Sequence, residues 1–265
     1  MGPVRRQLKT ALALLGGPQA PAGLTSLIYH RVGGGSPDER DVTTADFAQQ
    51  VRLLRQAPVV GLDVAVDRLE QGDGAPSVVL TFDDGFADVH TNAWPLLREA
   101  HMPFTVYAAT GFIGATMHWE GSTARDTGAP ALTWDQLREM VDSGLCTVAN
   151  HTHDHVRPEV LDAEQLDRCS EALERHLGVV PQHFAYTWGI PVPAMEPALR
   201  ARFRSAATGE LGRTRPGEDL HRLRRIPVRG SDPLPFFAAK LRGSLLPERA
   251  YAGIVGAAKR AGARA

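Results

Sequence analysis

The chain has 265 residues, a length that suits one large domain or two small ones. Apolar residues make up 43% and charged residues 22%, a balance typical of a globular protein with a sizeable core. The 29 basic and 30 acidic residues give a formal net charge of −1. Nonspecific nucleic-acid binding needs a strong positive field, so this composition argues against it. No stretch approaches the roughly 18–20 apolar residues that cross a bilayer.

The N-terminal segment, residues 1–23, carries Arg5, Arg6 and Lys9 ahead of a short apolar run at 11–15. A secretory signal usually has an apolar core of about 7–15 residues, which is longer than this run. We therefore expect an amphipathic lead-in helix, followed by a single domain over residues 24–265. A cleaved signal is the alternative, and it would mean export to the cell surface in place of a cytoplasmic location.

Beyond this segment, short apolar runs alternate with amphipathic helical patterns. The expected strands are 24–29, 78–82, 104–108, 146–149, 184–186 and 226–228; the expected helices are 45–55, a segment ending near 100, 134–143, 163–177 and 193–202. This alternation predicts an α/β fold with parallel strands and right-handed crossovers. We expect a (β/α) barrel, distorted and possibly incomplete, with an open doubly wound sheet as the alternative. In either fold the functional residues belong at the carboxyl ends of the strands. Residues 111–130 lack periodicity, and we expect them to cover that face as a loop.

Two adjacent carboxylates, Asp83 and Asp84, follow the strand expected at 78–82 directly. Paired carboxylates repel each other unless a cation or a shared proton relieves the repulsion. Their side chains point in different directions, so one can bind a metal while the other addresses a substrate. The alternative is that one of them only caps the following helix.

A histidine-rich segment, residues 150–155, follows the strand expected at 146–149. His151 and His155 are four residues apart, a spacing that places two imidazoles on one side of a helical turn. Two histidines and one carboxylate leave coordination positions open, as in a catalytic zinc site. His153 has the wrong spacing for a ligand. The alternative is a solvated histidine-rich turn.

These two clusters, together with the segment Phe184-Ala185-Tyr186-Thr187-Trp188-Gly189, resemble three ordered motifs of the polysaccharide deacetylase (NodB-homology) family, carbohydrate esterase family four. Segments 29–32, 132–137 and 225–228 extend the resemblance, which covers about residues 24–245. The resemblance implies a distorted barrel and the removal of an N-acetyl group from an acetylated sugar.

The roles implied by the resemblance fall on particular residues. Asp84, His151 and His155 would hold a divalent metal, usually zinc, although cobalt or nickel also suits this ligand set. Asp83 would be the general base, and the backbone N–H of Trp188 would stabilise the oxyanion. Substrate contacts are expected from Tyr186, Trp188 and Trp134, while Trp134 could equally be a core residue. His118 and Trp119, in the long loop, are further candidates for sugar contacts.

The sequence departs from the family pattern in two places that matter for catalysis. Ala185 stands where the third motif often has an arginine that orients the catalytic aspartate. Arg225, next to a late strand, is our candidate for the missing cation, with a surface position as the alternative. The late histidine that usually serves as general acid is also missing, and the last histidine is His221. His30 fits this role, as in members with rearranged motifs, unless it is a strand-end residue bonded to backbone.

We therefore expect metal-dependent hydrolysis of the N-acetyl group of an amino sugar in a glycan or glycoconjugate. The rearranged pattern resembles members acting on poly-β-1,6-linked N-acetylglucosamine. Two alternatives stay open. One is hydrolysis of an acetyl ester or another amide at the same metal site, and the other is a catalytically silent carbohydrate-binding protein.

Overall fold

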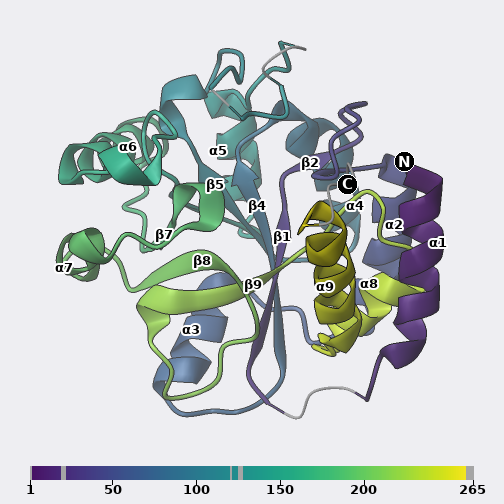
Figure 1. The fold of residues 1–265 in the computed structure, drawn as a ribbon. Helices are drawn as coiled ribbons and strands as arrows, with labels where there is room; N and C mark the ends of the chain where they lie inside the picture. Colours follow the sequence, from purple (N-terminus) through teal and green to yellow (C-terminus); the bar gives the residue numbers. More distant parts are fainter. Residues whose placement is uncertain (1, 19–21, 120, 125–127, 261–265) are drawn as a thin grey trace.

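A computed structural model describes residues 2–18, 22–119, 121–124 and 128–260 of the chain (Figure 1). Seven parallel strands close into a barrel in the order β1-β4-β5-β6-β7-β8-β9, and β1 pairs with both β4 and β9. The strands are β1 (Leu24–Tyr29), β4 (Ser77–Asp84), β5 (Phe104–Ala108), β6 (Cys146–Asn150), β7 (His183–Ala185), β8 (Ser205–Leu211) and β9 (Leu223–Pro227). The barrel expected from the sequence is confirmed. It is distorted at β7, whose only registered pair with β6 joins Asn150 to Phe184, and between β8 and β9, where the register shifts.

Helices surround this barrel, and a short two-stranded sheet of β2 (Arg31–Val32) and β3 (Asp41–Val42) lies apart from it. The helices are α1 (Gly2–Leu12), α2 (Thr44–Leu54), α3 (Leu62–Glu70), α4 (Trp94–Glu99), α5 (Trp134–Asp142), α6 (Ala163–Leu177), α7 (Glu196–Arg200), α8 (Leu234–Leu241) and α9 (Leu246–Arg260). A π-helical turn (Val89–Ala93) precedes α4, and 3-10 turns include Thr110–Phe112, Thr187–Gly189 and Pro193–Met195.

Local capping explains where two of these helices begin and end. The Thr133 hydroxyl accepts a hydrogen bond from the backbone N–H of Gln136, and the Gln136 side chain accepts one from the backbone N–H of Thr133. This reciprocal capping box starts α5. The Asp162 carboxylate caps α6 by accepting a hydrogen bond from the backbone N–H of Gln165, and Gly178 ends this helix in the left-handed conformation with φ 72°. These three helix boundaries follow from residues that can be recognised in the sequence.

The barrel interior is lined by small side chains on three neighbouring strands, Ala149, Ala185 and Ala207. The space that they leave is filled from the two flanking strands by Tyr107 of β5 and Arg225 of β9, whose guanidinium lies 5.5 Å from the Tyr107 ring centre. Both side chains are almost completely buried. The interior is therefore packed, and it carries a positive charge below the carboxyl ends of the strands.

Helix α1 lies beside α9 on one flank of the barrel (Figure 1). Its Lys9 is fully buried, and the Lys9 ammonium donates hydrogen bonds to Ser231 and Asp232, each at 2.6 Å. Asp232 also accepts a 2.6 Å bond from Lys240 of α8. The N-terminal helix is thus joined to the segment that follows β9. In the part of the chain described, no helix combines the length and apolar character required to cross a membrane.

Candidate active site

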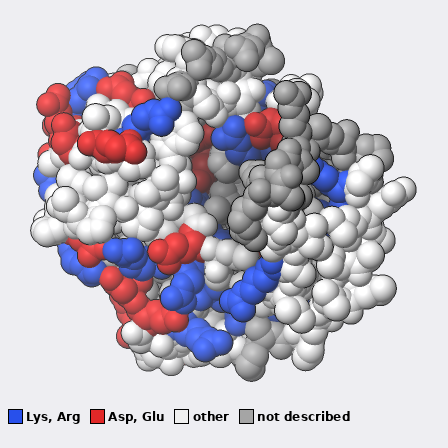
Figure 2. Space-filling view, viewed as in Figure 1, with Lys and Arg blue, Asp and Glu red and all other residues white. Residues whose placement is uncertain are grey.

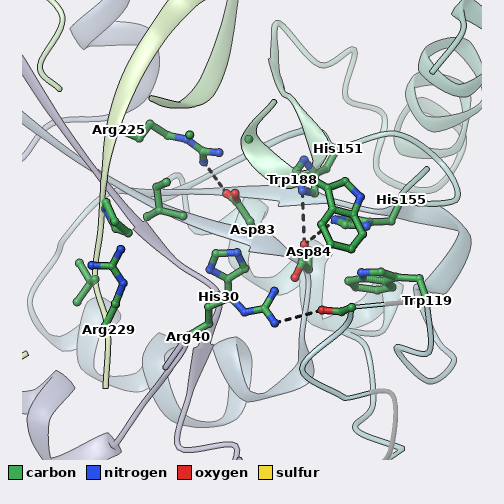
Figure 3. A pocket seen from close by; sticks show the side chains of 16 residues that line it. His30, Arg40, Asp83, Asp84, Trp119, His151, His155, Trp188, Arg225 and Arg229 are labelled. Atoms are coloured by element: carbon green, nitrogen blue, oxygen red, sulfur yellow. Dashed lines mark hydrogen bonds and ion pairs between the residues drawn. The ribbon is translucent and has the colours of Figure 1, made fainter. Parts of the chain in front are cut away.

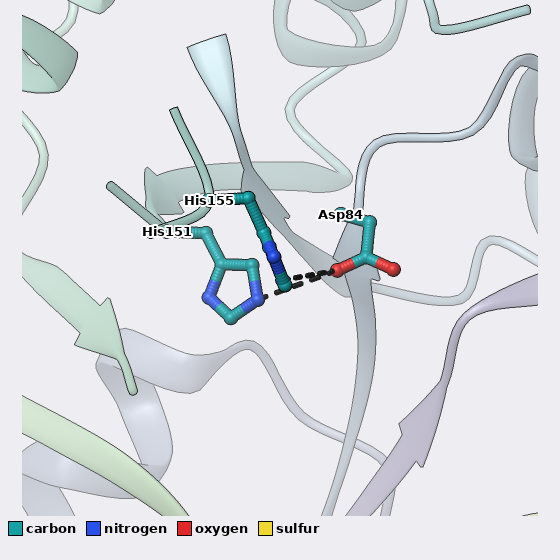
Figure 4. Close-up of side chains that lie close together, drawn as sticks. All are labelled: Asp84, His151 and His155. Carbon is teal, nitrogen blue, oxygen red and sulfur yellow. Dashed lines mark ion pairs between the residues drawn. The ribbon is translucent and has the colours of Figure 1, made fainter. Parts of the chain in front are cut away.

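The two acidic residues of the first cluster end strand β4 and point in different directions, as expected (Figure 3). Asp84 has a positive φ of 76°, and Gly85 follows with φ 95°. This left-handed turn aims the Asp84 carboxylate at two imidazoles: its Oδ1 lies 3.4 Å from Nε2 of His151 and 3.2 Å from Nε2 of His155 (Figure 4). Asp83 instead faces Arg225, at 2.7 Å.

The two histidines reach Asp84 through an irregular loop, and the helical turn expected between them is wrong. Residues 151–155 are not helical, because Thr152 and His155 both adopt left-handed conformations with φ of 65° and 48°. The Asn150 side chain accepts a hydrogen bond from the Thr152 N–H, and the Gln165 side chain accepts one from the Asp154 N–H. These side-chain acceptors replace helical hydrogen bonds. The loop is thereby held against the first turn of α6.

Each histidine ring is oriented by a neighbour. Nδ1 of His151 lies 2.8 Å from the carbonyl oxygen of Ala185. A carbonyl only accepts, so Nδ1 carries the proton and Nε2 presents its lone pair toward Asp84. The His155 ring stacks on Trp119, with ring centres 4.2 Å apart. Ala185, the departure from the family motif, thus contributes through its backbone.

Asp84, His151 and His155 fit a divalent metal site. Their ligand atoms all lie within 4.8 Å of one another, and the three side chains are buried. Ligands about 2.0–2.2 Å from a tetrahedral zinc ion lie roughly 3.3–3.6 Å apart. The carboxylate–imidazole separations of 3.2 and 3.4 Å agree with this geometry. Burial raises the pKa of the Asp84 carboxyl, but its close contacts with the two imidazoles hold that pKa well below its usual value.

Arg225 reaches Asp83 from β9, past the one intervening strand β1, so the structure places it inside the barrel and not on the surface. Its side chain is 1% exposed, and besides Asp83 it donates to the Thr208 carbonyl at 2.9 Å and to the Thr81 hydroxyl at 3.3 Å. Burial raises the pKa of Asp83, and the charge of Arg225 outweighs this effect with help from the histidines, so the pKa lies below its usual value. Asp83 is therefore a buried carboxylate that stays ionised.

These groups line a cavity of about 300 Å³ at the carboxyl ends of the strands (Figure 3). His30 lies at its wall, in the residue that follows β1, and burial lowers the pKa of its imidazole. Trp119, from the long loop, also lines the cavity. His118 is exposed, and its Nδ1 lies 2.8 Å from the Thr116 carbonyl.

Of the three residues expected to contact substrate, the structure brings only Trp188 to this cavity. Its ring is 38% exposed, and its backbone has a φ of 61°. Tyr186 is fully buried and packs against Phe184 outside the lining. Trp134 stacks on His176 at 4.2 Å, between α5 and α6, and is also outside the lining. Trp134 is therefore a packing residue, which was the alternative to a substrate contact.

Among the residues of the cavity wall that sequence reasoning missed are Arg40, Gly121 and Arg229. Arg40 donates a hydrogen bond to the Gly121 carbonyl at 3.1 Å, which joins two loops across the cavity mouth. Gly121 packs so closely on the Trp188 ring that a Cβ there would lie 2.3 Å from it. Arg229 follows the strand expected at 226–228 directly, so the strand-end rule could have indicated it. No sequence signal marks the other two.

Comparisons with known proteins agree with this geometry. The family model "Polysaccharide deacetylase" matches residues 70–200, which contain Asp83, Asp84, His151 and His155. The structure of IcaB from Ammonifex degensii is 31% identical in sequence and superimposes with a TM-score of 0.71, over 84% of this chain and 98% of IcaB. This chain belongs to the polysaccharide deacetylase family.

Two curated polysaccharide deacetylases are also similar over part of their length. The putative polysaccharide deacetylase YxkH of Bacillus subtilis is 28% identical over 151 residues, 56% of this chain and 48% of YxkH. The poly-β-1,6-N-acetyl-D-glucosamine N-deacetylase of Escherichia coli is 30% identical over 140 residues, 49% of this chain and 20% of that protein. The chain thus spans about half of one curated deacetylase and a fifth of the other.

Proposed function

We propose that this polysaccharide deacetylase hydrolyses the N-acetyl group of an N-acetylated amino sugar and releases acetate and a free amine. The observation that supports this most directly is the arrangement of Asp83 beside the Asp84–His151–His155 cluster, on one wall of the cavity. A carboxylate that stays ionised next to a metal-ligand set suits metal-assisted hydrolysis of an amide, because the carboxylate can act as a general base toward water at the metal.

Asp84, His151 and His155 would hold the metal, for which zinc is the first candidate. A bound zinc ion makes water acidic enough to lose a proton near neutral pH and polarises a carbonyl oxygen. Asp83 accepts that proton in our proposal, because Arg225 keeps its carboxylate ionised and fixes its orientation. The backbone N–H of Trp188, in the turn at the cavity wall, is the proposed donor to the oxyanion.

His30 is the proposed general acid for the departing amine. It lines the same cavity as Asp83 and approaches from the neighbouring strand β1 (Figure 3). Burial lowers the pKa of its imidazole, which makes the protonated ring a stronger acid toward the amine nitrogen. Base and acid therefore come from different strands and can act on one bond from two directions.

We propose N-acetylglucosamine in β-1,6 linkage as the first substrate to test, because the E. coli relative is named for that polymer. The experiment measures acetate release from β-1,6- and β-1,4-linked N-acetylglucosamine oligomers after chelation and again after zinc restoration. Asp83→Asn is the test variant. Asp142→Asn, an exposed aspartate at the end of α5, is the matched control.

We expect zinc-dependent acetate release that is lost in Asp83→Asn and retained in Asp142→Asn. The linkage that is hydrolysed faster then indicates the polymer. Acetate release that persists in Asp83→Asn would refute the assignment of the base. Zinc bound stoichiometrically with no acetate from either oligomer would contradict the proposed substrate and favour a silent binding protein.

A further inference from the structure

A second pocket shares no residue with the catalytic cavity, and four of its ten lining residues are arginines. It has a volume of about 390 Å³ and lies between the chain that follows β8, the start of β9 and the start of α9. Its lining residues are Leu211, Gly212, Arg213, Arg215, Glu218, Arg224, Gly243, Leu245, Leu246 and Arg249. Figure 2 shows basic side chains gathered over this β8–β9 region. We call this the basic pocket. Four guanidinium groups there face one carboxylate.

Most of that positive charge is not neutralised within the protein. Glu218 pairs with Arg224 at 3.0 Å, Glu210 lies 4.0 Å from the same guanidinium, and Glu218 is the one carboxylate among the lining residues. Among the described residues, the side chains of Arg215 and Arg249 have no hydrogen-bond or ion-pair partner, and both residues are exposed. Arg213 donates only to neutral oxygens, the Thr25 hydroxyl at 3.0 Å and a backbone carbonyl at 2.8 Å. Three like charges thus line one hollow, an arrangement that a bound anion stabilises.

Two of the four arginines are held in place before any ligand arrives. The two hydrogen bonds of Arg213 fix its guanidinium at the pocket wall. Burial and the neighbouring Arg215 lower the pKa of Arg213, an effect that an anion would reverse. The stem of Arg224 lies across Gly212, where a Cβ would come within 2.3 Å of it. The pocket therefore combines fixed donors with the two free guanidiniums of Arg215 and Arg249.

We propose that the basic pocket binds the phosphate group of a phosphorylated ligand. Planar guanidinium groups match the tetrahedral oxygens of phosphate in paired hydrogen bonds. The volume of the pocket leaves room for more than one phosphate group, so the phosphate is carried by a larger molecule, either a phospholipid headgroup or a free phosphorylated compound. This binding is separate from the proposed deacetylation, because none of the four arginines lines the catalytic cavity.

The test compares the zinc-loaded full chain with the double variant Arg215→Gln/Arg249→Gln. Both side chains are exposed, so the fold does not depend on them. The matched control is Arg52→Gln/Arg175→Gln, two exposed arginines on α2 and α6 that give the same change in net charge. Calorimetric titrations with inorganic phosphate and glycerol 3-phosphate give the dissociation constants. Co-sedimentation with phosphatidylglycerol vesicles, against phosphatidylcholine vesicles, tests the lipid source.

We expect the double variant to weaken phosphate binding at least about tenfold, since two charge-assisted contacts are lost, and the control to remain within about twofold of wild type. Acetate release should be the same in all three proteins. If the protein binds the free phosphates but not the vesicles, the ligand is a free phosphorylated compound. If it binds the vesicles and this binding requires Arg215 and Arg249, the ligand is a phospholipid headgroup. Equal dissociation constants in wild type and double variant, an equal loss in the control, or no binding of any probe would overturn the proposal.

Discussion

Replacing Arg225 by methionine tests whether this side chain positions the base. Methionine fills much of the volume but removes the guanidinium. Asp83 then loses its 2.7 Å ion pair, and the Thr208 carbonyl loses the donor at 2.9 Å. Asp83 is only 4% exposed, so solvent is a poor substitute for the missing charged partner. The variant therefore leaves a buried carboxylate without its compensating cation.

Two magnitudes follow from this geometry. Removing one partner of a buried ion pair costs about 3–5 kcal/mol of unfolding free energy, a large part of the roughly 5–15 kcal/mol that a domain has. Burial raises the pKa of Asp83, whereas the positive charge of Arg225 lowers it. Without that charge, the pKa of Asp83 rises. The ionised fraction falls at any given pH, so the acid limb of kcat/KM moves to higher pH. We expect kcat to fall about 10²-fold, the cost of a misplaced reacting group.

The assay combines urea unfolding with pH profiles of acetate release, each on zinc-loaded protein. Arg225→Lys is the conservative control, since it keeps the charge and loses the fork that reaches Thr208. It should fall between wild type and Arg225→Met. The double variant Arg225→Met/Asp83→Asn should be more stable than Arg225→Met, because the buried charge is gone. An Arg225→Met protein with wild-type unfolding free energy, an unshifted acid limb and kcat within about twofold would refute this reasoning.

Three further outcomes are expected. His30→Gln should lower kcat about 10²–10⁴-fold with unchanged zinc content, whereas loss of zinc would point to a structural role. Asp232→Asn should cost about 3 kcal/mol of unfolding free energy at pH 7 by leaving the buried Lys9 without a carboxylate partner, while Lys240 keeps its ion pair with Glu248. Burial raises the pKa of Asp232, but the two lysines hold that pKa below the usual 3.8. The contribution of Asp232 to the unfolding free energy is therefore lost as pH falls below about 4. Urea titrations from pH 7 to 3 should show that the variant lacks this acid-dependent loss. Gly121→Val, at φ 83°, should displace Trp188 and raise KM for oligosaccharides several-fold without loss of zinc, and an unchanged KM would contradict the proposed contact.

The sequence predicted those parts of the fold that depend on local signals. Periodicity and caps located β1, β5 and α6 at the residues where the structure has them, because Asp162 and Gly178 act within their own helix. The strand β8 was missed, since its sequence Ser-Ala-Ala-Thr-Gly-Glu-Leu has a single β-branched residue, Thr208, and no aromatic residue. Barrel closure stabilises β8 through neighbours distant in the chain, and such pairing leaves no local signal.

The same distinction between local and long-range signals applies to the residues of the site. Asp83, Asp84, His151 and His155 could be found because they lie at the end of a strand or within five residues after it. The helical turn expected between the two histidines was wrong, since left-handed residues and side-chain acceptors shape that loop. Arg40 and Gly121 could not be found, because their position depends on two loops meeting above the barrel.

The stacking of Trp119 on His155 gives this protein a built-in optical signal. Trp119 and Trp188 both lie against the His155 ring, at 4.2 and 5.9 Å between ring centres. Indole emission responds to the charge of an imidazole in contact with it, and coordination of an ion changes that charge. The other two tryptophans, Trp94 and Trp134, pack among helices outside the cavity and supply a constant background. Metal loading can therefore be followed by intrinsic fluorescence, in real time and without labels, in the same cuvette as the reaction.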